Sequence, residues 1–179
     1  KLGKAVAALK VGDGAAAGVE QGPLINMAAV EKVESLLKEG VSHGAKIVQG
    51  GKRHALGGSF FEPTIVRDVT TEMEFAREEI FGPVVTLFRF RTDDEAIRMA
   101  NDTEYGLAAY FYARDVGRIF KVLEGLEYGI VGVNEGIIST EVAPFGGMKE
   151  SGLGREGSKY GIEDFLEIKY VAMGGLGIP

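Results

Sequence analysis

A glycine-rich stretch and two adjacent carboxylates are the parts of this sequence whose residue types could do chemistry. GLGREG at 152–157 has the G-x-G-x-x-G spacing that cradles a dinucleotide pyrophosphate, and Glu78–Glu79 could in principle share acid and base work. A dinucleotide loop also needs a strand before it and an acidic residue about 20 residues after it. Both are missing, so we interpret 152–157 as a glycine-rich structural loop.

The remaining reactive side chains predict no catalytic centre. Glu78 and Glu79 are neighbours in sequence, and neighbours do not face each other in a helix or a strand. The two histidines, His43 and His54, lie in polar stretches near glycines and fit no ligand or triad pattern. The chain has no cysteine, which excludes disulfides, Cys-ligated metals and a thiolate nucleophile within it. From the residues alone we expect no catalytic residue and no metal site.

Composition narrows the possible partners. The chain has 179 residues, a formal net charge of -6 and 45% hydrophobic residues, and its basic residues are scattered. Nucleic-acid binding needs clustered positive charge, and a membrane span needs about 20 consecutive apolar residues, so neither is predicted. Lys4 and Lys10 interrupt the apolar residues of 1–10, which favours the end of an amphipathic helix over a targeting segment.

The elements that must position these residues alternate between helix and strand. Helix caps at Asn26, Thr92 and Asp115 mark three helices. The strand–helix–strand–helix–strand order from 84 to 134 predicts an α/β fold with a parallel sheet and covering helices. The expected helices are 26–43, 92–102 and 115–126, and the expected extended segments are 45–51, 60–69, 84–90, 107–113 and 129–134.

The regular pattern stops after Asn134. Residues 135–158 form a long irregular segment, and irregular loops of that length in compact domains are often functional. A last strand is expected at 165–171, where it could pair outside the main sheet. We therefore predict a domain of residues 1–162 and a strand and tail at 163–179.

Two segments carry a family resemblance. EEIFGP at 78–83 and APFGGMKESGLGREGSKYG at 143–161 resemble the C-terminal part of an aldehyde dehydrogenase, and the similarity is greatest to succinate-semialdehyde dehydrogenases. Further matches occur in order along the chain, at KVGDG (10–14), GPLIN (22–26), FFEPTI (60–65), ANDTEYGLAAYFYARD (100–115) and GIVGVNEG (129–136). The resemblance implies an incomplete catalytic domain of that fold, followed by an oligomerisation strand.

The resemblance implies contacts to a nicotinamide cofactor, NAD or NADP. Glu79 matches the glutamate that accepts hydrogen bonds from the two nicotinamide ribose hydroxyls, a task that suits the two oxygens of a carboxylate. Phe81 matches the phenylalanine beside the nicotinamide. The alternative for Phe81 is packing in the core.

The resemblance also implies contacts to an aldehyde substrate. Phe145 matches an aromatic residue that lines the aldehyde pocket and excludes water from the acyl intermediate. Ser139 matches the serine that hydrogen-bonds the distal carboxylate of succinate semialdehyde, and Thr140 is its neighbour if the register differs by one. The alternatives are loop anchoring for Phe145 and a local backbone hydrogen bond for Ser139.

Other implied features concern structure and assembly. Asn134 and Arg155 match family positions that we interpret as structural, with Arg155 holding loop carbonyls together. Residues 165–171 resemble the strand through which the parent enzyme forms a homo-oligomer, a dimer or a tetramer. The family's nucleophilic cysteine, general-base glutamate and oxyanion-hole asparagine lie before the position that corresponds to Lys1, so we expect this chain alone not to catalyse.

Two alternatives remain open. The parent could act on another small aldehyde, or the chain could be a non-catalytic assembly module that pairs with full-length subunits. The sequence does not distinguish NAD from NADP, nor the cytoplasm from the mitochondrial matrix.

Overall fold

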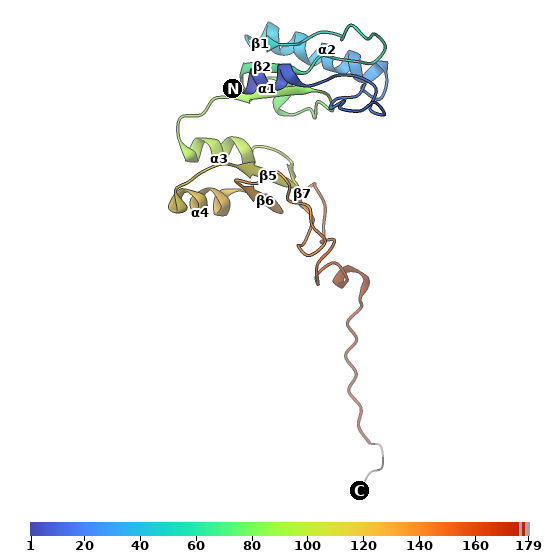
Figure 1. Ribbon diagram of the computed structural model, residues 1–179. Coiled ribbons are helices and arrows are strands. Elements are labelled where there is room, and N and C mark those ends of the chain that lie inside the picture. Colours follow the sequence, from blue (N-terminus) through green and yellow to red (C-terminus); the bar gives the residue numbers. More distant parts are fainter. Residues whose placement is uncertain (176, 178–179) are drawn as a thin grey trace. The chain divides into compact units, whose positions relative to one another are not determined.

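The computed structural model describes residues 1–175 and 177, and the chain divides into two compact units (Figure 1). The first unit is Lys1–Arg91 and the second is Thr92–Pro179. This division differs from the boundary that the sequence suggests near residue 162. It does not test whether 163–179 is a separate oligomerisation segment, which stays a prediction.

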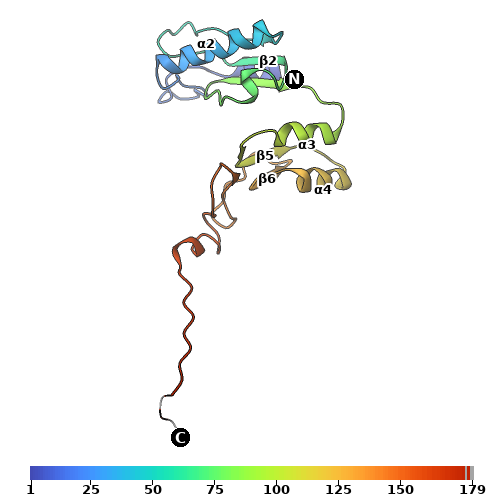
Figure 2. The same cartoon turned by 180° about the vertical axis from the view of Figure 1, so that it is seen from behind.

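In the first unit, helix α2 packs against the sheet that contains β2 (Figure 2). This sheet has three strands in the order β1-β2-β3. β1 runs antiparallel to β2, and β2 runs parallel to β3. Asn26 caps α2 as expected, because its side chain accepts a hydrogen bond from the Ala29 amide at 2.9 Å. The elements are α1 (Leu2–Ala8), α2 (Met27–Ser42), β1 (Lys46–Gln49), β2 (Thr64–Val69), the short 3-10 helix η1 (Glu74–Ala76) and β3 (Val84–Phe88).

The hydrophobic core lies where the apolar stripe of α2 meets β2. Val33, Phe61 and Val66 are 0% exposed, so the spacing of apolar residues along 26–43 marks the buried face correctly. Gly40 of α2 packs against the Phe75 ring, where a Cβ atom would collide with it. This core fixes the position of the segment between η1 and β3, which contains Glu79 and Phe81.

The second unit contains two short helices and two pairs of strands. β5 and β6 are parallel and are connected through α4, as the strand–helix–strand pattern predicts. Thr92 and Asp115 cap α3 and α4 by accepting hydrogen bonds from amides in the first turn, at 3.2 and 2.7 Å. The elements are α3 (Asp93–Asn101), β4 (Tyr105–Gly106), β5 (Ala108–Phe111), α4 (Val116–Gly125), β6 (Ile130–Val133), β7 (Met148–Lys149) and the 3-10 helix η2 (Glu163–Phe165).

The α/β class with parallel strands is confirmed, but the expectation of one sheet from 84 to 134 is wrong. β3 pairs with β2, from Thr64↔Val84 to Val69↔Phe88, and belongs to the sheet of the first unit. β5 and β6 form a separate pair within the described part of the chain. The order of helices and strands along the chain predicts parallel strands, but it does not predict which strands lie next to each other. In this structure the buried strand β2 is the neighbour of β3.

The expected strand at 165–171 is not formed by the described residues. The chain instead makes η2 and then continues with exposed residues from Leu166 to Gly175. Leu166 has extended backbone angles (φ -113°, ψ 138°), but a strand also needs a neighbour for its backbone groups, and this segment has none in the structure. Its pairing with a second chain stays a prediction. No helix in the described part of the chain is both long and apolar enough to cross a membrane.

Candidate functional site

The EEIFGP segment is held in place by α2 and β2. Lys32 of α2 donates a hydrogen bond to the backbone carbonyl of Glu79 at 2.7 Å and pairs with the Glu78 carboxylate at 3.4 Å. Gly82 fits against Val33, since a Cβ at this position would lie 2.6 Å from a Val33 methyl group. The Thr64 amide donates to the Pro83 carbonyl at 2.8 Å and ties the end of the segment to the sheet.

These contacts leave the side chains of Glu79 and Phe81 directed away from the core. Phe81 is 80% exposed, whereas its neighbour Ile80 packs against the core. Phe81 also has a φ of 51°, in the left-handed region that a bulky side chain rarely adopts. Core packing therefore does not explain Phe81. Strained backbone conformations cluster at functional sites, and the contact of Phe81 with a cofactor stays a prediction.

The resemblance predicts that the Glu79 carboxylate binds a ribose. It is exposed, and it has no hydrogen-bond or ion-pair partner among the residues that the structure describes. Both of its oxygens can therefore accept from vicinal hydroxyl groups. Lys32 acts on the backbone of Glu79 and on the Glu78 side chain, so it positions Glu79 without neutralising it.

In the second unit, Asn134 starts the long loop that contains Ser139 and Phe145. Its side chain accepts from the Ala113 amide at 2.9 Å and donates to the Ala113 carbonyl at 2.7 Å, which extends the β5–β6 pairing by one residue. Its φ of 56° then turns the chain out of the sheet. Asparagine tolerates this left-handed conformation better than most residues, which gives Asn134 the structural role expected for it.

Glu135 shapes the first turn of the loop. Its carboxylate accepts hydrogen bonds from the amides of Gly136 at 2.8 Å and Ile137 at 3.2 Å. The Ile137 and Gly136 amides hold the pKa of the Glu135 carboxyl below its ordinary value, so it is ionised at neutral pH.

Ser139 follows this turn on the surface of the loop. It is exposed, and its hydroxyl has no hydrogen-bond partner within the described part of the chain. A serine that satisfied its own backbone, which is the structural alternative, would show such a bond. The hydroxyl is therefore available to a ligand. Thr140 is also exposed, with its hydroxyl 3.5 Å from the Glu141 carboxylate.

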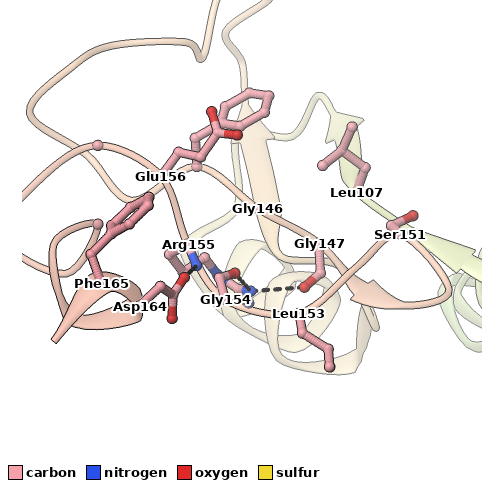
Figure 3. A pocket seen from close by; sticks show the side chains of 13 residues that line it. Leu107, Gly146, Gly147, Ser151, Leu153, Gly154, Arg155, Glu156, Asp164 and Phe165 are labelled. Carbon is pink, nitrogen blue, oxygen red and sulfur yellow. Dashed lines mark hydrogen bonds between the residues drawn. The ribbon is translucent and has the colours of Figure 1, made fainter. Parts of the chain in front are cut away.

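Phe145 is half-buried and lines a cavity of about 440 Å³. Figure 3 shows the cavity and labels ten of its other lining residues. Its backbone exchanges two hydrogen bonds with Glu156, at 2.9 and 2.7 Å, so loop anchoring and wall formation coexist in this residue. Leu107, Leu153 and Phe165 provide further apolar lining, and Ser151, Arg155, Glu156 and Asp164 provide polar groups. The lining of this cavity therefore mixes apolar and polar groups.

The glycines of GLGREG serve the local backbone. Gly152, Gly154 and Gly157 have φ values of 119°, 75° and 63°, which favour glycine at all three positions. Next to them the Arg155 side chain donates to the carbonyls of Gly147 at 2.8 Å and Gly154 at 2.6 Å (Figure 3). Both observations agree with a structural glycine-rich loop and with a structural role for Arg155.

Sequence reasoning overlooked two residues that contribute to these regions, Lys32 and Asp164. Lys32 is recognisable as a polar position on α2, but its contact with Glu79 spans 47 residues. Asp164 accepts a hydrogen bond from the Arg155 amide at 3.2 Å, a contact that depends on the turns between 157 and 163. No sequence pattern predicts the contact of Lys32 with Glu79 or the contact of Arg155 with Asp164.

The two histidines make local contacts. His43 is exposed and pairs with Glu39 one helical turn before it, at 2.9 Å. His54 accepts a hydrogen bond from the amide of Leu56, two residues along the chain. Among residues 1–175 and 177, no group of three His, Asp or Glu side chains is placed to hold a metal ion.

Comparison with known proteins gives consistent matches over nearly the whole chain. Residues 1–171 match the protein family described as the aldehyde dehydrogenase family. The mitochondrial succinate-semialdehyde dehydrogenase of Arabidopsis thaliana is 62% identical over 173 residues, which are 97% of this chain and 33% of that protein. The 3-sulfolactaldehyde dehydrogenase of Pseudomonas putida is 58% identical over 176 residues, which are 98% of this chain and 36% of that protein.

A solved crystal structure is also similar to this chain. The crystal structure of succinate-semialdehyde dehydrogenase from Burkholderia pseudomallei matches with a TM-score of 0.92 and 59% identity, over 95% of this chain and 35% of that one. The chain thus spans about a third of the length of the relatives it matches.

Proposed function

The chain belongs to the aldehyde dehydrogenase family, and we propose that it is the C-terminal part of an NAD(P)-dependent succinate-semialdehyde dehydrogenase. The reaction converts succinate semialdehyde, NAD(P)+ and water into succinate, NAD(P)H and two protons. The aldehyde carbon loses a hydride and gains the oxygen of water, so atoms and electrons balance.

The observation that carries this proposal is the free hydroxyl of Ser139. It stands exposed on the loop that continues into the half-buried Phe145. The hydroxyl of a serine can donate a charge-assisted hydrogen bond to the second carboxylate of the substrate. A purely apolar aldehyde has no such carboxylate and cannot use this bond. Phe145 supplies an apolar wall that limits the access of water.

The EEIFGP segment would hold the cofactor. The Glu79 carboxylate accepts hydrogen bonds from the ribose hydroxyls, and the exposed ring of Phe81 packs beside the nicotinamide. When bound, the nicotinamide supplies a hydride acceptor. Lys32 fixes the main chain of Glu79 so that the carboxylate keeps its orientation. The choice between NAD and NADP depends on groups outside this set.

The nucleophile is proposed to lie outside this chain, since the family reaction uses a cysteine and the sequence has none. The coding region upstream of Lys1 tests this directly. We expect an in-frame segment with a cysteine nucleophile, whose product oxidises succinate semialdehyde, while the 179-residue chain alone is inactive. Turnover by the isolated chain, or a coding region that adds no such segment, would overturn the proposal.

Substrate choice is tested by Ser139→Ala in the longer polypeptide. Loss of a hydrogen bond to a charged group costs about 1.5–3 kcal/mol, so we expect kcat/KM for succinate semialdehyde to fall about 10- to 100-fold relative to butanal. Thr140→Val is the matched control and should leave the ratio unchanged. If Thr140→Val lowers the ratio instead, the neighbouring hydroxyl is the ligand. If neither variant changes it, the carboxylate assignment is wrong.

A second candidate keeps the reaction and changes the anionic group of the substrate. The 58% identity to a 3-sulfolactaldehyde dehydrogenase favours it, because a sulfonate offers the same kind of acceptor oxygens to Ser139 as a carboxylate. A higher kcat/KM for the sulfonate-bearing aldehyde than for succinate semialdehyde would select this candidate.

The remaining alternative is a non-catalytic assembly module. If the chain is such a module, we expect it to co-purify with full-length subunits, and we expect those subunits to keep their activity when the chain is removed.

A further inference from the structure

Two arms of the second unit lie against each other beside the Phe145 cavity. The first arm, 141–147, contains Phe145, and the second arm, 154–158, contains Arg155. Their backbones exchange the two Phe145–Glu156 hydrogen bonds, and the Ser158 amide donates to the Glu141 carbonyl at 2.9 Å. The position of Phe145 therefore depends on how firmly the second arm holds the first.

Arg155 makes the side-chain contact that joins the arms. One nitrogen of its guanidinium, Nη1, donates to the Gly147 carbonyl of the first arm at 2.8 Å and to the Gly154 carbonyl of its own arm at 2.6 Å. Both hydrogen bonds are partly buried, where they are less exposed to competition from water. Arg155 thus adds a side-chain hydrogen bond between the arms, two residues from Phe145, to the three backbone hydrogen bonds that join them.

The glycines around Arg155 make room for this arrangement. A Cβ at Gly146 would lie 2.8 Å from Cδ of Arg155, so the arginine stem can cross the first arm only over a glycine. A Cβ at Gly154 would collide with the Asp164 carboxylate, which instead accepts the Arg155 amide at 3.2 Å. Asp164 lies in η2. Its hydrogen bond with the backbone amide of Arg155 holds this residue from the side opposite the first arm (Figure 3).

From this geometry we propose that Arg155, held by Asp164, is a positioning residue for the Phe145 wall of the aldehyde pocket. Arg155 acts through the backbone of the first arm and does not contact the reacting atoms. The inference rests on the proposed function, because it assigns Phe145 to the pocket of that enzyme. In addition to its structural role in the loop, Arg155 would then affect how tightly the enzyme binds the aldehyde.

The first test is Arg155→Met in the longer polypeptide, which keeps an unbranched side chain and removes the donors. We expect KM for succinate semialdehyde to rise about tenfold or more, because small displacements of positioning groups have large effects, while the NAD(P)+ Kd changes less than about twofold. Lys159→Met removes the same charge from an exposed position four residues away and is the matched control. Equal kinetics for Arg155→Met and wild type would overturn the proposal.

The second test needs no activity. In the 179-residue chain, Arg155→Met should speed hydrogen exchange at the Phe145 and Glu156 amides, which bond across the arms, and leave the α2 amides of the first unit unchanged. Asp164→Ala should have a smaller effect in the same direction, and Asp164→Asn, which keeps an acceptor, should restore protection. Unchanged exchange in Arg155→Met would also overturn the proposal. A wild-type longer polypeptide that oxidises no aldehyde would count against the proposed function, whereas the exchange result would still decide whether Arg155 holds the arms.

Discussion

At the scale of single residues, Phe81 combines two properties that do not favour folding. Its backbone is left-handed, with a φ of 51°, and its aromatic ring is 80% exposed. A left-handed conformation costs an ordinary residue about 1–2 kcal/mol, and an exposed ring recovers little of that by burial. The contacts of Gly82 with Val33 and of Lys32 with Glu79 keep the segment in this conformation.

Replacement of Phe81 by asparagine should separate stability from cofactor binding. Asparagine tolerates the left-handed region, so we expect the free energy of unfolding of Phe81→Asn to stay the same or to rise by up to about 1 kcal/mol. Loss of the aromatic contact should weaken NAD(P)+ binding about 2- to 10-fold in the longer polypeptide. Urea unfolding and cofactor titration measure the two effects. A marked loss of stability with unchanged cofactor affinity would make Phe81 a structural residue.

At the scale of elements, two helical glycines have opposite surroundings. Gly40 in the last turn of α2 is buried, and a Cβ there would collide with the Phe75 ring. Gly117 near the start of α4 is exposed, and a Cβ there would meet its nearest atom, Oδ1 of Asp115, at an ordinary 3.4 Å. Helix propensity alone favours alanine at both positions by about 1 kcal/mol.

We therefore expect the same substitution to have opposite signs in the two helices. Gly117→Ala should raise the free energy of unfolding by about 0.5–1 kcal/mol, since nothing opposes the gain in propensity. Gly40→Ala should lower it, because overpacking of a dense core costs about 1–3 kcal/mol and exceeds that gain. Denaturant unfolding of the 179-residue chain measures both. Stabilisation by Gly40→Ala would show that the Phe75 ring moves aside without cost.

Local signals predicted the elements well, and contacts between elements poorly. Asn26 and the apolar stripe after it predicted α2, and the polar residues Thr92 and Asp115 predicted the starts of α3 and α4. The pairing of β3 with β2 and of Gly106 with Met148 depends on which backbone groups meet after folding. The same applies to the site: family motifs indicated Ser139 and Phe145, but not the contact of Arg155 with Asp164.

At the scale of the whole molecule, burial is uneven between the two units. All buried hydrophobic side chains of the described residues lie between Leu24 and Phe75, in the first unit. The second unit has a two-stranded parallel pair, β5–β6, with Tyr110 49% exposed on it. Parallel strands are usually covered on both faces, so this unit resembles part of a larger sheet. This agrees with a chain that spans about a third of its relatives.

The segment after η2 has the pattern of a strand without a neighbour. Leu166, Ile168 and Tyr170 alternate with Glu167 and Lys169, so in an extended conformation the apolar residues share one face. Ile168 is 100% exposed and Tyr170 is 88% exposed, which leaves this face uncovered in the single chain. Such an edge favours pairing with a second chain, and this pairing stays a prediction.

Ile168→Lys should therefore prevent assembly without affecting the fold of the single chain. A fully exposed side chain contributes no burial to that fold, so the thermal unfolding of the 179-residue chain should be unchanged. In an assembled longer polypeptide the lysine would place an unpaired charge on an apolar contact face, which is costly. Light scattering should detect a smaller particle for Ile168→Lys and an unchanged one for Glu167→Gln, whose side chain lies on the opposite face. Assembly of Ile168→Lys at the wild-type size, or a wild-type protein that is monomeric at every concentration, would remove this segment from the interface.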